Sequence, residues 1–324
     1  MTSAEMTRAQ ATTVAEAIAL IEAAAGPDDL FGDDDAGRRY RRLARLTHPD
    51  ACPGDGRAAA AFARLAGLWQ RHQGSRGPLV ARGDMANLYR VRQGLLKIVR
   101  DPADNDLMRR EAVSLGVLRT RAEPRLRAYF PALVEARRRQ DPVSRVERHA
   151  NVLGELPGFV SLAEVADAFG GGVDARDAAW MWRRLLVAIG AAHRAGVIHG
   201  AVLPAHVLIH PAEHGLVLVD WCYSVAAPAG RLAAAVGRYR HWYPAEVLAG
   251  RAAGPDLDIW LAARCMTELI GAGMPDRLAR FAAGCMLANP GRRPRDAWQL
   301  LAELDELLDR MYGPRVFRPF AMPA

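Results

Sequence analysis

Cysteine is scarce in this chain of 324 residues, and the four that occur are widely separated. They are Cys52, Cys222, Cys265 and Cys285, and no two of them form a C-x-x-C pair. Paired spacing is what a zinc ribbon, a redox motif or a disulfide framework would show. The pattern therefore argues against a zinc site and indicates a reducing compartment.

Long apolar runs are also missing. No stretch approaches the roughly 20 apolar residues that a membrane-spanning helix needs. Glu16 and Glu22 interrupt the one apolar segment near the N-terminus, and no basic region precedes it as in a signal peptide. We therefore expect a cytoplasmic protein with no membrane partner.

Charge is present in both signs and does not by itself define a function. The net charge of +7 comes almost wholly from arginine, in an alanine-rich composition that suggests a GC-rich genome. Basic residues scattered over many helices usually lie on solvated faces, so we do not expect nucleic acid as a partner. With 51% hydrophobic and 24% charged residues, the chain has the composition of a globular protein of two or three domains.

Residues 37–73 contain two helical patterns on either side of a short polar turn. Tyr40 and Leu43 fall on one face of the first pattern, and arginines occupy the other faces. Phe62 and Trp69 belong to an apolar stripe in the second pattern, repeated at helical spacing. The two patterns predict an antiparallel pair of helices.

The turn between these helices reads His48-Pro49-Asp50. A basic helix, an HPD turn and an antiparallel helix, preceded by a shorter helix over residues 14–25, resemble a J-domain. In J-domains the HPD turn and the basic face before it engage a heat-shock ATPase chaperone and stimulate its ATP hydrolysis. The resemblance implies chaperone-binding roles for His48, Pro49, Asp50, Arg41, Arg42 and Arg45.

The segment upstream departs from the J-domain pattern. Many J-domains have an aromatic start here, whereas this chain has Asp28–Gly32 followed by the acidic run Asp33–Asp35. The alternative is a small helical hairpin in which Pro49 ends a helix and Asp50 caps a turn.

A second motif spans Val197–Trp221, which reads VIHGAVLPAHVLIHPAEHGLVLVDW. This layout resembles a protein-kinase catalytic loop, H-R-D-L-K-P-E-N, followed by a strand that ends in D-F-G. The alignment puts Ala201 at the catalytic-base position, Leu203 at the lysine position and His206 at the asparagine position. Only the D-F-G aspartate is kept, as Asp220.

Further kinase-like landmarks flank this loop. Gly83 is the one glycine kept from the phosphate-binding loop. Lys97 lies in an apolar strand, where an unpaired ammonium would be costly to bury, so we expect Glu111 on the next helix as its partner. Tyr243 to Glu246 resembles the A-P-E sequence, and we expect Glu246 to pair with Arg293.

These patterns predict an α+β protein in which a small all-α J-domain hairpin precedes a bilobal, bacterial-type protein-kinase-like fold. Its small lobe would be β-rich and its large lobe mostly α. Phe317 and Phe320 of the tail are expected to dock on the large lobe. The expected parts are a disordered N-terminus (1–12), the J-domain-like helical domain (13–73), a linker (74–78), the kinase-like domain (79–312, with lobes 79–156 and 157–312) and a C-terminal tail (313–324).

The kinase resemblance implies ATP and Mg²⁺ as cofactors, with Asp220 as the metal ligand. Its nucleotide-binding residues would be Gly83, Lys97, Glu111 and Asp220. No residue takes the catalytic role, because Ala201 occupies the position of the base. Imidazole is a poor ligand for magnesium, so we expect His206 to form a hydrogen bond within the loop.

The arginine that follows the histidine of H-R-D in kinases is missing here together with the catalytic base. Gly200 replaces the arginine that reads a phosphorylated activation loop, and Ser224 is the only Ser or Thr hydroxyl between Asp220 and Glu246. We therefore expect a J-domain/pseudokinase adaptor that binds nucleotide without phosphotransfer, recruits a heat-shock ATPase chaperone and serves a protein client.

Two alternatives stay open. One is an atypical ATP-dependent serine/threonine protein kinase with a degenerate catalytic loop, in which His199, His206 or His210 replaces the base. The other is a scaffold in which neither the nucleotide site nor the chaperone site works.

Overall fold

The structure is a computed structural model that describes residues 11–31, 36–140, 147–170 and 172–323. It is an α+β protein whose sheets are antiparallel where their pairing is described. The chain divides into two compact units: the first takes Met1–Met108 and Val134–Leu153, and the second takes Arg109–Leu133 and Gly154–Ala324. Within the described ranges, no helix is both long and apolar enough to cross a bilayer.

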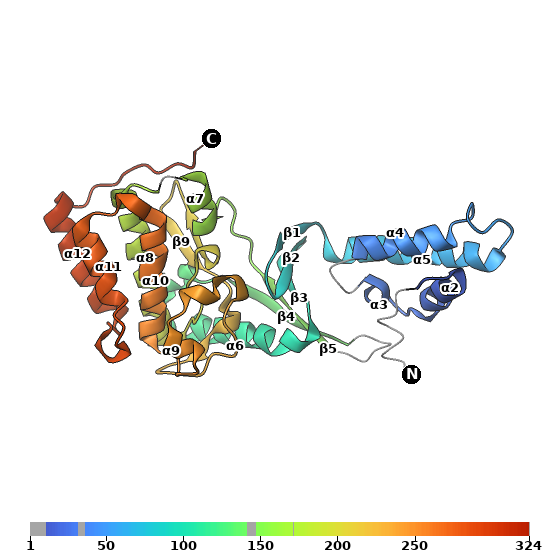
Figure 1. The fold of residues 1–324 in the computed structure, drawn as a ribbon, viewed down its shortest axis with the longest axis horizontal. Coiled ribbons are helices and arrows are strands. Elements are labelled where there is room, and N and C mark those ends of the chain that lie inside the picture. The colour runs from blue at the N-terminus through green and yellow to red at the C-terminus, as the bar shows by residue number, and fades with distance from the viewer. Residues whose placement is uncertain (1–10, 32–35, 141–146, 171, 324) are drawn as a thin grey trace. The chain divides into compact units, whose positions relative to one another are not determined.

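Helices form the N-terminal part of the first unit (Figure 1). Because Thr13 and Glu16 exchange hydrogen bonds in a capping box, the first described helix begins at Val14. Asp55 caps the longest of these helices by accepting the backbone N–H groups of Arg57 and Ala58. The helices are α2 (Val14–Ala23), α3 (Pro27–Phe31), α4 (Ala36–Thr47) and α5 (Gly56–Arg76).

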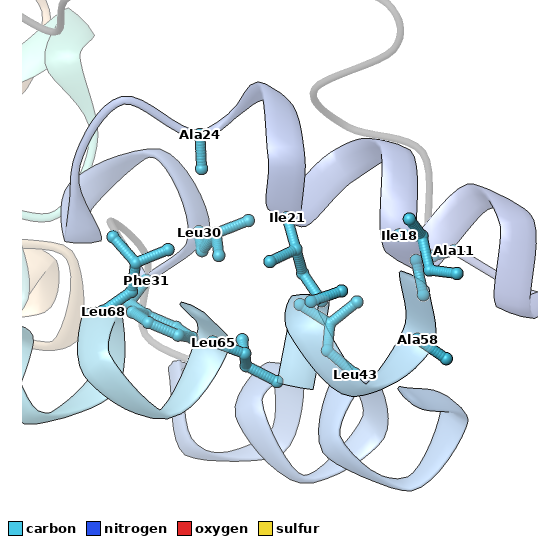
Figure 2. Close-up of a cluster of buried hydrophobic side chains, with 12 residues drawn as sticks. Ala11, Ile18, Ile21, Ala24, Leu30, Phe31, Leu43, Ala58, Leu65 and Leu68 are labelled. Carbon is cyan, nitrogen blue, oxygen red and sulfur yellow. The ribbon is translucent and has the colours of Figure 1, made fainter. Parts of the chain in front are cut away.

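A buried apolar cluster joins these four helices (Figure 2). Ile21 of α2, Phe31 of α3, Leu43 of α4 and Leu65 of α5 are all fully buried. One amphipathic face from each helix is thereby removed from water, which is what stabilises helices this short. Ala11 also lies in the cluster, so the disorder expected for residues 1–12 does not hold at Ala11, and residues 1–10 lie outside the described residues.

The linker expected at 74–78 is shorter than the sequence pattern indicated. Helix α5 continues through Arg76 and ends at Gly77, whose φ of 62° lies in the left-handed region. A Cβ at Gly77 would lie 1.7 Å from the carbonyl oxygen of Arg90, so only glycine fits there. Gly77 and Pro78 alone separate the helix from the first strand.

A five-stranded sheet completes the first unit, with strand order β1-β2-β3-β5-β4. Lys97 in β3 lies opposite Leu88 of β2 and Asn151 of β5. The Asn151 amide donates to the carbonyl of Met108 at 3.0 Å. The strands are β1 (Leu79–Arg82), β2 (Ala86–Val91), β3 (Gly94–Val99), β4 (Leu133–Gln140) and β5 (Glu147–Leu153).

The second unit is mostly helical, and its longest helix, α8 (Ala175–Ala195), is largely buried and packs on α10 and α12 (Figure 1). Asp174 caps α8 and Gly196 ends it with a φ of 94°. Helix α6 (Asn105–Arg121) contributes its residues from Arg109 onward to this unit. The remaining elements are η2 (Pro124–Tyr129), β6 (Val160–Ser161), α7 (Leu162–Ala168), β7 (Val197–Ile198), η3 (Pro204–His206), β8 (Val207–His210), β9 (Gly215–Leu218), η4 (Trp221–Tyr223), β10 (Val225–Ala226), η5 (Gly237–Trp242), α9 (Ala245–Leu248), α10 (Pro255–Ile270), η6 (Gly271–Gly273), α11 (Asp276–Cys285), η7 (Pro290–Arg292) and α12 (Ala297–Tyr312); η1 (Pro102–Asp104) precedes α6.

The C-terminal segment after α12 has no helix or strand in its described residues and lies against α7 and α8. Phe320 is 7% exposed and stacks on Phe169 at 5.4 Å. Arg318 forms two hydrogen bonds with the carboxylate of Asp177, at 2.9 and 3.3 Å. Phe317 touches the ring of His214 but stays 64% exposed, so Phe320 is the docked aromatic residue.

Candidate functional site

The loop after α8 is held by a buried carboxylate from α10. Asp258 is fully buried and accepts the backbone N–H groups of His199 and Gly200, each at 2.8 Å. The ring of His193 contacts the same carboxylate at 2.8 Å. Burial opposes ionisation of Asp258, but these hydrogen bonds and the neighbouring histidines outweigh it and lower its pKa. The loop backbone is therefore fixed by a charged anchor.

The loop is fully buried at both positions where the kinase resemblance leads us to expect a polar catalytic side chain. Ala201 and Leu203 are both 0% exposed, so apolar core fills the sites where the kinase alignment would put aspartate and lysine. Gly200 has a φ of 77°, and a Cβ there would lie 2.7 Å from the carbonyl oxygen of Tyr223. An arginine is excluded at position 200 by both strain and space.

His206 connects this loop to Asp220. Its Nδ1 lies 2.9 Å from the carbonyl oxygen of Ala201, which confirms the hydrogen bond expected within the loop. Its Nε2 lies 3.2 Å from Oδ2 of Asp220. The imidazole therefore contacts an acceptor atom through each of its ring nitrogens.

Asp220 has an unusual backbone conformation, with a φ of 66°. Non-glycine residues rarely adopt this region, and such conformations cluster at functional sites. The following residue, Trp221, is fully buried and donates its Nε1–H to the carbonyl of Leu218 at 2.8 Å. The indole packs edge-on against Phe130 and thereby fixes the turn that carries Asp220.

The segment after Asp220 is bonded to α6. Ser224 donates to the carbonyl of Trp221 at 2.6 Å, and its hydroxyl lies 2.7 Å from that of Ser114. Arg110 donates to the Ser224 carbonyl at 3.3 Å. Because Ser224 is buried and bonded in this way, its hydroxyl serves the structure and is not presented to a kinase.

Glu111, Asp220 and Cys222 come together at this junction. One carboxylate oxygen from each acid and the Cys222 sulfur all lie within 4.8 Å of one another. Glu111 and Cys222 are buried, and Asp220 is half-buried. Two of the expected nucleotide-binding residues are therefore neighbours, and Cys222 joins them as a neighbour that the sequence pattern did not indicate.

Each of the three histidines considered as a replacement base is engaged in at least one hydrogen bond. Burial lowers the pKa of His199 to about 4, its Nε2 bonds the carbonyl of Val219, and its Nδ1 accepts the N–H of Ala201. Both nitrogens of His206 face acceptor atoms. His210 accepts the backbone N–H of Glu213 at 3.2 Å and its ring lies against Phe159.

Gly83 and Lys97 belong to the first unit. Gly83 lies in the turn between β1 and β2, and its N–H already donates to the carbonyl of Ala86 at 2.9 Å. Arg100 donates to the carbonyls of Gly83 and Asp84. Lys97 is 4% exposed, and it is the one lysine among the 43 lysine and arginine residues of the chain.

The expected ion pair between Glu246 and Arg293 is confirmed, with Nη1 and Oε1 2.5 Å apart. The buried guanidinium also donates to the carbonyls of Leu287 and Ala288 and lies 4.3 Å from the ring of Trp260. It is a well-satisfied buried charge that joins the end of the 220–246 segment to the helices that follow.

A shallow hollow of about 600 Å³ surrounds the HPD turn in the first unit. The turn closes because the carbonyl of His48 accepts two backbone N–H groups, while the His48 ring lies edge-on to Phe62 at 5.1 Å. Asp50 is exposed beside it. Arg41, Arg45, His48 and Asp50 all line the hollow, and Arg42 lies half-buried on the same helix, so the expected chaperone-binding residues gather at one end of the α4–α5 pair.

No family model matches this sequence, and no curated protein matches it. Function is therefore inferred from the residues and their geometry.

Proposed function

We propose that this chain is a J-domain/pseudokinase adaptor that binds nucleotide without phosphotransfer and recruits a heat-shock ATPase chaperone to a protein client. The observation that carries this proposal is the buried, apolar environment of Ala201 and Leu203 in a loop otherwise held rigidly by Asp258. A kinase needs a residue there to orient the substrate hydroxyl and a lysine near the γ-phosphate. Asp258 holds this loop in a fixed conformation, but the loop lacks both of these groups.

Several features support a kinase-like frame. The antiparallel sheet of the first unit and the mostly helical second unit fit a β-rich small lobe and an α-rich large lobe. The Glu246–Arg293 pair and Asp220 lie at landmarks of the kinase alignment. The residues at these landmarks support the fold, and none of them would transfer phosphate.

Lys97 is the main reason to propose nucleotide binding. Arginine has taken every other basic position, and the two side chains are not interchangeable where a compact charge must meet a phosphate. The glycine loop contributes less, because the Gly83 N–H is already bonded. We infer that Lys97 supplies most of the phosphate contact.

Magnesium fits this site only in part. Asp220 and Glu111 offer oxygen ligands, but the other groups beside Asp220 are an imidazole nitrogen and a thiol, which magnesium disfavours. Nucleotide binding is therefore expected to depend weakly on Mg²⁺. When bound, the ion would neutralise phosphate charge.

The single lysine makes nucleotide binding directly testable. An acyl-phosphate derivative of ATP transfers its acyl group to a nearby amine, so mass spectrometry should find Lys97 modified and ATP should block the reaction. The N-terminal amine serves as the internal control, since ATP should not protect it. A Lys97→Arg variant should also lose the thermal stabilisation by ATP that the parent shows, which is about 2.7 kcal/mol at 100 times the dissociation constant. Acylation of Lys97 that ATP does not reduce would contradict the proposal.

Chaperone recruitment is tested with a partner heat-shock ATPase. The parent chain should stimulate its ATP hydrolysis, and His48→Gln should abolish that stimulation without changing the melting temperature. Arg45→Ala should weaken the effect, whereas Arg71→Ala, an exposed arginine of α5 outside the lining of the hollow, should not. If the His48 variant and the parent stimulate ATP hydrolysis equally, the HPD sequence is only a structural turn.

A further inference from the structure

A cavity of about 1040 Å³ lies within the second unit, lined by residues of α8, of α12 and of the C-terminal segment. Sites for small molecules usually occupy about 300–1,000 Å³ and combine apolar walls with a few polar groups. Trp180 and Arg183 of α8, Asp305 of α12 and Phe317 of the segment belong to this lining. These residues lie outside both the loop around Asp220 and the hollow at the HPD turn, so the cavity is a separate site.

Aromatic and apolar side chains contribute much of the lining. The imidazole of His214 stacks on the indole of Trp180, with ring centroids 4.1 Å apart and 6° between the planes. Phe317 lies 4.5 Å from the same imidazole. Val316 and Phe317 are 76% and 64% exposed, so part of the lining is bare apolar surface. A flat aromatic molecule in the cavity would remove that surface from water.

The indole of Trp180 also carries an unused hydrogen-bond donor. Trp180 is 7% exposed, and its Nε1–H has no hydrogen-bond partner among the residues that the structure describes. A buried indole N–H usually finds an acceptor. The missing acceptor favours a ligand that brings one.

The charges of the lining favour an anion. Four arginines and three acids line the cavity. Arg318 is paired with Asp177 and Glu306 with Arg310, and both partners lie outside the lining. Three arginines and two acids of the lining then remain, which leaves one positive charge in excess.

Arg315 is the arginine best placed to meet such an anion. It is exposed, and it forms no hydrogen bond or ion pair with any residue in the described ranges. Arg183 pairs with Asp305 at 2.7 Å. Burial lowers the pKa of Arg183; Asp305 opposes this, but the charges of Arg315 and Arg184 lower it further. Negative charge added beside Arg183 and Arg315 would therefore be stabilised.

We propose that this cavity binds a small aromatic carboxylate. Its ring packs against Val316 and Phe317, and its carboxylate pairs with Arg315, whose planar guanidinium matches a carboxylate. The site requires neither nucleotide nor a chaperone, so it goes beyond the proposed function.

Calorimetric titration of the full-length chain with naphthoate tests the site in the absence of nucleotide. The matched probe is naphthamide, which has the same ring system and no charge. We expect saturable binding of one equivalent of naphthoate, with an affinity about tenfold or more above that of naphthamide, because the pair with Arg315 is charge-assisted. Absence of saturable naphthoate binding, or equal affinity for the two probes, overturns the proposal.

Variants at exposed positions assign the two contacts. Arg315→Gln should lower the affinity for naphthoate about tenfold and leave that for naphthamide unchanged. Phe317→Ala should weaken the binding of both probes, because it removes the apolar contact. Arg277→Gln, at an exposed arginine of α11 outside the lining, should bind naphthoate as the parent does. Unchanged naphthoate affinity in Arg315→Gln, or an equal loss in Arg277→Gln, contradicts the site.

Discussion

Oδ1 of Asp258 accepts a hydrogen bond from the backbone N–H of Gly200 at 2.8 Å. The other oxygen holds the N–H of His199 at the same distance, so one buried carboxylate fixes two consecutive peptide groups. This anchor does not touch any group that would transfer phosphate. The backbone of the loop that leads to Ala201 is therefore fixed by a single side chain.

Asp258→Asn should therefore destabilise the protein. The amide side chain has one acceptor oxygen instead of two, so either His199 or Gly200 loses its partner in the core. An unsatisfied buried donor costs about 1–3 kcal/mol, with more when a charged acceptor is lost. Urea unfolding measures the change. The control variant Asp167→Asn, at an exposed position of α7, should have an unfolding free energy within about 0.5 kcal/mol of the parent's. Equal destabilisation by the two variants would show that Asp258 does not stabilise the loop.

An aspartate at position 201, where the kinase resemblance expects the catalytic base, should not produce a kinase. Ala201→Asp places a carboxylate at a position that is 0% exposed, with Leu203 beside it also buried. Burial of an unpaired charge is strongly unfavourable. We expect a loss of several kcal/mol in unfolding free energy, and still no phosphate incorporation. The matched control is Ala166→Asp on the exposed face of α7, which should be tolerated. A stable, active Ala201→Asp protein would mean that the loop is more open than its packing indicates.

Acid should destabilise the protein through His199. Burial lowers its folded-state pKa to about 4, from an ordinary value of 6.5. Between those values the unfolded chain binds a proton that the native ring excludes, so unfolding free energy falls as the pH decreases from about 6.5 to about 4. The two pKa values correspond to about 3 kcal/mol.

Urea unfolding at several pH values measures this contribution. His199→Asn should be less stable at neutral pH but should lose less stability on acidification, whereas His241→Asn, at an exposed position, should retain the parent's decrease. Identical pH dependence in the parent and the His199 variant would rule out His199 as the buried titrating group.

The C-terminal segment should detach when its docked aromatic residue is removed. Phe320 is 7% exposed between Phe169 and Trp180, and a buried phenylalanine contributes about 1.5–3 kcal/mol. Phe320→Ala should speed tryptic cleavage after Arg315 by about tenfold or more. Phe317→Ala should have little effect, because Phe317 is already 64% exposed. If both variants are cleaved at the parent's rate, the segment is held by other contacts.

Local signals predicted the helices best. Asp174 and Gly196 mark the ends of α8 in the sequence, and both perform those roles in the structure. The Glu246–Arg293 pair also followed from a motif, although the two residues lie 47 positions apart. Linker composition was less informative, since Gly74 and Ser75 continue α5 and the helix ends only where Gly77 adopts a positive φ.

Long-range contacts that no motif indicates could not be predicted from the sequence. Nothing near Cys222 indicates that it meets Glu111, and Ser114 and Ser224 are 110 positions apart in a chain without paired motifs for either. The hydrogen bonds that the loop backbone donates to Asp258 likewise depend on tertiary packing. The kinase resemblance predicts which groups the loop lacks, and the structure shows that the residues at those positions, Ala201 and Leu203, are buried.

The most direct test of the central claim is phosphate transfer by the full-length chain. Purified protein is incubated with labelled ATP, Mg²⁺ and a generic protein substrate, and incorporation into the chain and the substrate is measured. We expect no incorporation above the level of an Asp220→Asn variant, because Ala201 and Leu203 replace the groups that orient the hydroxyl and meet the γ-phosphate. Incorporation that Asp220→Asn abolishes would contradict the account and make the protein an active kinase.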